Sequence, residues 1–386
     1  MEETGVMKVK EHDFRLFTND FDGRNFICDA QFCKLYHGYI PQGWNGFEAR
    51  EVTIKVWVET TRFNDHLREG KAESKLRFIK LLENFITETD FLISTKATSC
   101  PYLPRLIAQC HDKDNKFLGV VYDLKSSNTL GNFVDKGEFK WLERVKVAVG
   151  IAGLLRFLHC EEPRYVVHDL SALHIMLDKD SNPFLFNYFN LTPSPRPVGS
   201  NGKFSHGRYG VMAYADINFI YTGRMPEAAD VFAFGVILCE LLYKRKVDHR
   251  LRVDHKLKVD HKLKVDHKVY SFMEQSSLFL YVDARRDYPL QKSRTNGLAR
   301  GPLCGILVPT CGISKRQKEY SFVDKSFEED PSFNALDGPK ISKLARFCVD
   351  ENPIIRPNIQ VVLKWLEELH AVRDHYMMHK PYQASI

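Results

Sequence analysis

The sequence contains no stretch of apolar residues long enough to cross a lipid bilayer. Its longest apolar run, residues 231–243, is interrupted by Glu240 and is shorter than the roughly 20 residues that a spanning helix needs. The first residues also lack the pattern of a secretory signal peptide, and the second residue is not the glycine that N-myristoylation requires. From the sequence we therefore expect a cytoplasmic protein without a membrane anchor.

Paired cysteines are also missing. The nine cysteines are odd in number and scattered along the chain, and none belongs to a C-x-x-C pair. This distribution excludes the disulfide framework of a small secreted domain, and it is not the ligand spacing of a zinc site. It indicates reduced thiols in a cytosolic compartment.

The excess positive charge is confined to one short segment. The chain has 55 basic and 49 acidic residues, a net charge of +6, and residues 244–268 contain ten of the former and four of the latter. That segment carries the whole excess, because ten taken from 55 and four taken from 49 leave 45 residues of each sign. Since the rest of the chain is electrically balanced, we expect no binding to nucleic acid.

The basic segment is also a repeat. From residue 247 to residue 269 the unit Val-Asp-His-Lys/Arg-Leu-Lys/Arg recurs and places a histidine at every sixth position. Metal ligands normally converge from different parts of a chain, whereas these histidines follow one another along a line, so we expect no metal site here. The composition favours a solvated surface loop, an insert at 244–269, with binding of nucleic acid or of an acidic partner as the alternative.

Residues 167–178, Val-His-Asp-Leu-Ser-Ala-Leu-His-Ile-Met-Leu-Asp, resemble the catalytic loop of protein kinases, H-R-D-L-K-x-x-N-I-L-L-D. The resemblance places Asp169 at the catalytic base, but Ser171 replaces the loop lysine and His174 replaces the metal-binding asparagine. Residues 187–189, Asn-Tyr-Phe, stand where kinases have Asp-Phe-Gly, so the aspartate that binds Mg²⁺ is replaced as well. We therefore expect Asp169 to be retained without a metal site beside it.

The amino-terminal third resembles the nucleotide-binding lobe of the same family. Residues 27–38 keep the hydrophobic frame of its glycine-rich loop, including Ile27 and Leu35. The three glycines of that loop are replaced by Cys28, Ala30 and Cys33. Glycine lets backbone N–H groups approach phosphates without an intervening Cβ, so these replacements argue against a tight nucleotide cradle.

Lys55 ends the pattern Val-Thr-Ile-Lys, which resembles the kinase strand whose lysine binds ATP phosphates. Its expected partner is Glu88, 33 positions further on, which is a longer spacing than is usual in the family. The resemblance therefore implies a degenerate ATP site formed by Lys55, Glu88, Ile27 and Leu35. It implies that no cofactor is required and that any ATP binding is weak.

The carboxy-terminal part resembles the rest of the kinase frame. Residues 213–219 resemble G-Y-x-D-P-E-Y, so Asn218 replaces the glutamate that normally pairs with the arginine found here as Arg356, and we expect the charged pair to be lost. Asp230 matches the aspartate of a buried helix that ties back to the catalytic loop. The positions of the apolar stack that links the two lobes are occupied by Leu92, Leu103, Val167 and Tyr188.

These motifs follow one another in the family order from about residue 21 to residue 372. We therefore expect an α+β, bilobal protein-kinase fold with a mainly β N-lobe and a mainly α C-lobe. The expected boundaries are an N-terminal tail at 1–20, an N-lobe at 21–123, a C-lobe at 124–376 and a C-terminal tail at 377–386.

Within the kinases, the chain resembles the plant receptor-like/Pelle group, and its altered D-F-G and D-P-E segments are similar to those of cytoplasmic ZRK-type pseudokinases. Members of that group are adaptors that join an NLR-type immune receptor to a second kinase. The resemblance implies a catalytically inactive adaptor in plant signalling or immunity. It also implies a cytoplasmic location, with attachment to the plasma membrane only through partners.

Two alternatives stay open at this point. Lys55, Glu88 and Asp169 favour a weak Ser/Thr protein kinase, and they also suit a switch that binds ATP without transferring phosphate. The magnitude of the metal contact favours inactivity, since a charge pair about 4 Å apart is worth about 4 kcal/mol at an effective dielectric constant of about 20. Losing the carboxylate at position 187 should lower the rate at least about 10³-fold.

Overall fold

The computed structural model describes most of the chain. The described residues are 5–30, 33–57, 71–112, 117–194, 214–216, 218–219, 225–246 and 321–376. The expected insert lies outside them from residue 247 onward, and so does the expected C-terminal tail at 377–386. In the described part of the chain, no helix is both long enough and apolar enough to cross a membrane.

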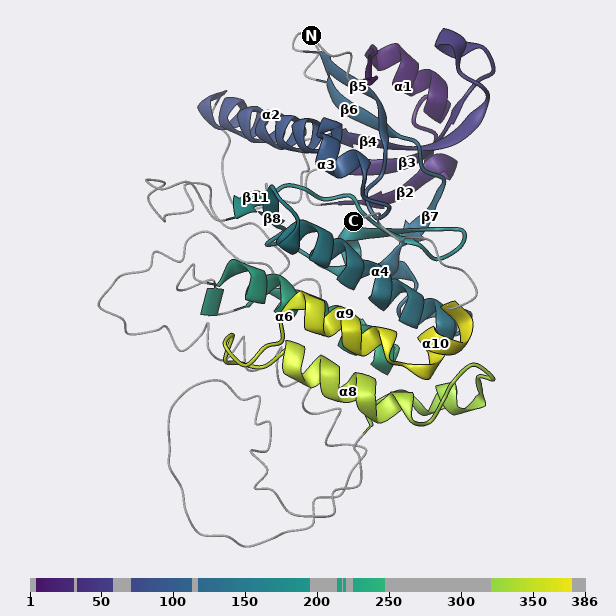
Figure 1. The fold of residues 1–386 in the computed structure, drawn as a ribbon. Coiled ribbons are helices and arrows are strands. Elements are labelled where there is room, and N and C mark those ends of the chain that lie inside the picture. The colour runs from purple at the N-terminus through teal and green to yellow at the C-terminus, as the bar shows by residue number, and fades with distance from the viewer. Residues whose placement is uncertain are drawn as a thin grey trace, which may run out of the picture.

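The smaller lobe is built on a six-stranded sheet with the strand order β1-β5-β6-β4-β3-β2 (Figure 1). Its strands are β1 (Met7–Lys8), β2 (Phe26–Asp29), β3 (Cys33–Ile40), β4 (Arg50–Trp57), β5 (Leu106–Asp112) and β6 (Phe117–Tyr122). All neighbouring strands are antiparallel except β1 and β5, which are parallel. Three short helices complete the lobe: η1 (Gly23–Asn25), η2 (Trp44–Gly46) and α3 (Thr95–Thr98).

A helix covers each face of this sheet. Because side chains of a strand alternate between the two faces, Leu35 of β3 belongs to one apolar cluster and its neighbour Tyr36 to another. Helix α2 (Lys71–Ile93) packs on the face of Leu35, and α1 (Glu11–Thr18) packs on the face of Tyr36. The expectation of a mainly β smaller lobe is confirmed.

Residues 5–20 do not form the tail that was expected from the sequence. Strand β1 pairs with β5 at the edge of the sheet, and α1 buries Phe14 and Phe17 against its outer face. Gly119 of β6 makes room for this helix, because a Cβ there would lie 2.5 Å from the ring of Phe14. The smaller lobe therefore begins before residue 21, and the boundary is corrected.

The larger lobe is mainly helical. Its helices are η4 (Leu130–Asn132), α4 (Trp141–Cys160), η5 (Ala172–His174), α6 (Pro226–Tyr243), η7 (Lys325–Glu329), α8 (Asp337–Cys348), α9 (Ile359–Glu367) and α10 (His370–Tyr376). Its strands are β7 (Ser126–Thr129), β8 (Arg164–Val166), β9 (Ile175–Asp178), β10 (Pro183–Leu185) and β11 (Thr192–Ser194). Most residues of α4 are buried, and the α+β bilobal arrangement expected from the sequence is confirmed.

One hydrophobic core runs through both lobes. The four residues expected to form a stack between the lobes are all buried in it: Leu92, Leu103, Val167 and Tyr188. The ring of Tyr188 lies 5.7 Å from that of Phe91, which belongs to α2 of the smaller lobe. The two lobes are therefore packed against each other through apolar contacts.

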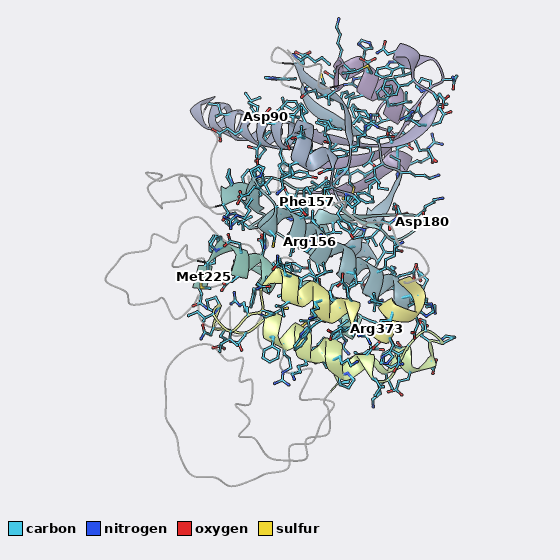
Figure 2. All side chains as sticks on the ribbon, in the orientation of Figure 1. Asp90, Arg156, Phe157, Asp180, Met225 and Arg373 are labelled. Carbon is cyan, nitrogen blue, oxygen red and sulfur yellow. The ribbon has the colours of Figure 1, made fainter. Side chains whose placement is uncertain are left out.

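A buried lysine adds a polar contact between the lobes. Lys96 of α3 donates hydrogen bonds to the backbone carbonyl oxygens of Phe157 (3.0 Å), Pro163 (2.8 Å) and Glu161. These carbonyls lie at and just beyond the carboxyl end of α4, and Figure 2 labels Phe157 on that helix. Burial lowers the pKa of Lys96, but a cation that binds the free carbonyls of a helix end is well placed electrostatically.

Replacing Phe14 by alanine should destabilise the protein by about 3–5 kcal/mol, because it removes a buried ring and leaves a cavity over Gly119. Chemical unfolding of the full chain measures this change. Leu16→Ala in the same helix is the control, since Leu16 is 57% exposed and its loss should cost less than about 0.5 kcal/mol. Equal stability of the two variants would mean that α1 does not pack as described.

Candidate functional site

Lys55 and Glu88 form a buried ion pair between the sheet and helix α2. Lys55 lies on β4 and Glu88 on α2, and each is only 2% exposed. The Lys55 ammonium donates to Glu88 Oε2 and to the backbone carbonyl of Phe186 at 2.7 Å. The pair expected from the sequence is therefore present despite its long spacing.

Aromatic side chains enclose this ion pair. The Lys55 Nζ lies 4.6 Å from the centre of the Trp57 ring and 5.9 Å from that of Tyr188. The hydroxyl of Tyr122 donates to the second oxygen of Glu88. Burial raises the pKa of Glu88, an effect that Lys55 opposes, and burial also raises the pKa of Tyr122. The ammonium is thus held inside the protein by its own neighbours.

The hairpin formed by β2 and β3 is partly apolar. A hydrogen bond of 2.8 Å from Ala30 N to Cys33 O ends the turn between β2 and β3. Cys28 and Ala30 pack against the core that contains Ile27 and Leu35. Burial raises the pKa of Cys28 to about 12, so its thiol stays neutral at physiological pH.

The catalytic-loop segment is held in place by Asp230 of α6. The backbone N–H groups of Val167 and His168 donate to its two carboxylate oxygens, each at 2.8 Å. His159 of α4 places its Nε2 2.9 Å from one of these oxygens. His168 has a φ of 61°, a left-handed conformation that is uncommon outside glycine. Asp230 therefore ties α6 to the loop, as the sequence predicted.

Asp169, His174 and Asn187 meet in one hydrogen-bonded group. His174 Nδ1 lies 2.8 Å from the backbone oxygen of Asp169, which can only accept, so Nδ1 carries the hydrogen. The Asn187 amide nitrogen donates to Asp169 Oδ2 at 3.1 Å and lies 3.3 Å from His174 Nε2. One carboxylate is thus bonded to a neutral amide beside an imidazole.

This donor set does not suit Mg²⁺. Magnesium prefers several oxygen ligands in an octahedral arrangement, and here Asp169 is the single carboxylate of the group. Among the described residues, no three His, Cys, Asp or Glu side chains are placed to hold a metal ion.

The structure overturns one expectation about the segment that precedes α6. Arg356 pairs with Asp216, whose Oδ2 lies 2.6 Å from its Nη1, and both side chains are buried. The Asn218 amide instead donates to the backbone oxygen of Glu351 at 2.6 Å. The prediction that the charged pair is lost was therefore wrong, because an aspartate two positions earlier supplies the carboxylate.

Known proteins are similar to this chain over most of its length. A family model described as protein tyrosine and serine/threonine kinase matches residues 25–278. The chain is 29% identical, over 238 residues, to the "EPD1-interacting receptor-like cytoplasmic serine/threonine-protein kinase 5D" of Gossypium barbadense; the match covers 61% of this chain but only 46% of that relative. It is 28% identical over 359 residues to the "Probable serine/threonine-protein kinase PBL11" of Arabidopsis thaliana. That match covers 91% of this chain and 75% of the relative.

Replacing Lys55 by methionine should destabilise the protein by about 3–5 kcal/mol, since it leaves Glu88 buried without its cation. The double variant Lys55→Met/Glu88→Leu should recover most of this loss, because it removes both charges. Urea unfolding measures the three proteins.

Lys125→Met is the matched control for this experiment. Its ion pair with Glu51 is exposed on both sides, so its loss should change stability by less than about 1 kcal/mol. Parent-like stability of Lys55→Met would show that the buried pair does not form in solution.

Proposed function

The chain belongs to the protein tyrosine and serine/threonine kinase family, and we propose that it is a catalytically inactive member that acts as a protein-binding adaptor. The observation that carries this proposal is the contact between the Asn187 amide and Asp169 Oδ2, at 3.1 Å. In active kinases the residue at position 187 is the aspartate that binds Mg²⁺. Here a neutral hydrogen-bond donor takes that place.

The electrostatics of this contact supports inactivity. A kinase needs two Mg²⁺ ligands, the D-F-G aspartate and the catalytic-loop asparagine, to hold the ATP phosphates in line. In this chain those positions are Asn187 and His174. Asn187 offers an amide oxygen without negative charge, and the imidazole of His174 is a poor ligand for a hard cation. Asp169 is still able to accept a proton, but no metal-bound phosphate is positioned for its use.

The buried lysine supports the same conclusion from the other side of the site. Lys55 is 2% exposed, and its ammonium is already bonded to Glu88 and to the carbonyl of Phe186. An ATP phosphate could reach only the one remaining N–H donor of an ammonium that is almost completely buried. We therefore infer that the protein needs no cofactor and binds ATP weakly at most.

One observation favours the alternative of a weak Ser/Thr kinase or an ATP-binding switch. The Lys55–Glu88 pair and Asp169 are three of the residues that active kinases use, and the pair is formed. The matched relatives carry the names of serine/threonine kinases. The same pair also stabilises the fold, however, so its presence does not require catalysis.

The adaptor role rests on the resemblance to cytoplasmic ZRK-type pseudokinases. By that resemblance the partners are a second kinase and an NLR-type immune receptor, in plant signalling or immunity. The protein would act in the cytoplasm, and at the plasma membrane only through its partners. Such a role requires a stable kinase-like surface and no phosphate transfer, and a continuous core through both lobes supplies that stability.

Phosphate transfer from ATP, with Mg²⁺ or Mn²⁺, should not exceed that of the Asp169→Ala variant. Radiolabelled autophosphorylation and transfer to a generic substrate protein measure it. Strong phosphorylation that disappears in Asp169→Ala would overturn the proposal of inactivity.

A second measurement distinguishes a lost metal site from a lost nucleotide site. The double variant His174→Asn/Asn187→Asp restores both family ligands. Mg-ATP should therefore raise the melting temperature of this variant more than it raises that of the parent.

Association with the partners should be equal for the parent and Asp169→Ala, because an adaptor does not use the carboxylate.

A further inference from the structure

The exposed side of helix α8 carries charge of one sign only. Of its twelve residues, four are exposed, and these are Lys340, Lys343, Arg346 and Phe347. None of the three basic side chains forms an ion pair with another residue in the described part of the chain. Within the described ranges, the three exposed cations of α8 therefore have no ion-pair partner.

The turn after α8 adds two exposed isoleucines. Ile354 is 77% exposed and Ile355 is 52% exposed. Their backbone is fixed, because Ile354 N donates to Asn352 Oδ1 at 3.1 Å and Ile355 N donates to Asn352 O at 3.0 Å. The Nε of the buried Arg356 also donates to the backbone oxygen of Asp350, at 2.7 Å. The apolar side chains thus project from an ordered turn.

Aromatic contacts join this region to helix α9. The ring of Phe347 lies 6.0 Å from that of Trp365 in an edge-to-face arrangement, and Lys343 Nζ lies 5.9 Å from the same Trp365 ring. Figure 1 shows α8 and α9 side by side on the larger lobe. We call Lys340, Lys343, Arg346, Phe347, Ile354 and Ile355 the α8 surface.

We propose that the α8 surface binds an acidic segment of a partner protein that carries apolar anchor side chains. Phe347, Ile354 and Ile355 are large apolar side chains exposed within one stretch of nine residues. Exposed apolar groups of this kind mark interaction sites, and interfaces are enriched in aromatic residues and arginine. The unpaired cations select a partner of negative charge and accelerate its approach. The isoleucines and Phe347 supply the area from which an anchor excludes water.

Two other occupants fit the surface less well. A second copy of the chain would bring the same cations together across a symmetric interface, which repels. A membrane normally needs a cluster of about 4–8 basic residues. The α8 surface has three basic residues, fewer than such a cluster.

This surface would serve the proposed adaptor, but it does not depend on catalytic inactivity. An active kinase could use the same residues to bind a partner. The phosphate-transfer assay measures catalysis and does not depend on the α8 surface. A failure of binding would therefore leave the proposed inactivity untouched, and detection of activity would leave the binding result untouched.

The test uses the full chain and a labelled synthetic peptide of about 16 residues with leucine at every third or fourth position and glutamate elsewhere. Fluorescence anisotropy should show binding that weakens with added salt. Lys343→Glu/Arg346→Glu and, separately, Ile354→Ser/Ile355→Ser should each weaken it by about tenfold or more. A peptide with serine in place of leucine should bind to the parent as weakly as the leucine peptide binds to these variants.

The matched control is Lys136→Glu/Lys179→Glu, which makes the same change in net charge at exposed sites elsewhere on the larger lobe and should bind like the parent. All variants should keep the parental melting temperature because the changed residues are exposed. The proposal is overturned if the parent does not bind the peptide or if the α8 variants bind it equally well. It is also overturned if those variants abolish only binding to phosphatidylserine vesicles, or only self-association in sedimentation.

Discussion

The buried carboxylate of Asp230 is the group on which the arrangement of the larger lobe depends. It accepts hydrogen bonds from the backbone of Val167 and His168 and contacts His159, so one side chain joins α6, α4 and the catalytic-loop segment. Leaving such a carboxylate without partners would cost several kcal/mol, so the three segments stay together. None of these contacts involves a metal or a nucleotide. The frame of a kinase is therefore preserved by requirements that are separate from catalysis.

The same requirement explains the composition of the altered site. A buried carboxylate needs donors, and Asp169 would lack them if the residues beside it were simply apolar. Asn187 donates to it, and its backbone oxygen accepts from His174. Asn187 thus gives the carboxylate a neutral donor, and His174 holds the backbone of the same residue. Retention of an aspartate at a catalytic position is thus compatible with a purely structural role.

Much of the fold could be predicted from the sequence, because the motifs come in a fixed order along the chain. The Lys55–Glu88 pair was likewise predictable from two local patterns. The packing of α1 was not, since a strand of two residues and a helix of eight residues are too short to show a distinct periodicity in the sequence. The pairing of Arg356 with Asp216 was missed because the motif directs attention to Asn218, whereas the geometry of the turn decides which carboxylate reaches the arginine.

The lysine at the junction of the lobes has a consequence for motion. Enzymes of two lobes open and close on microsecond-to-millisecond timescales, and release of product often limits their turnover. Separating the lobes here would pull the Lys96 ammonium away from three backbone oxygens while much of its side chain is shielded from water. Lys96 therefore opposes separation of the lobes at this junction. Any opening motion must either break these hydrogen bonds or pivot about them.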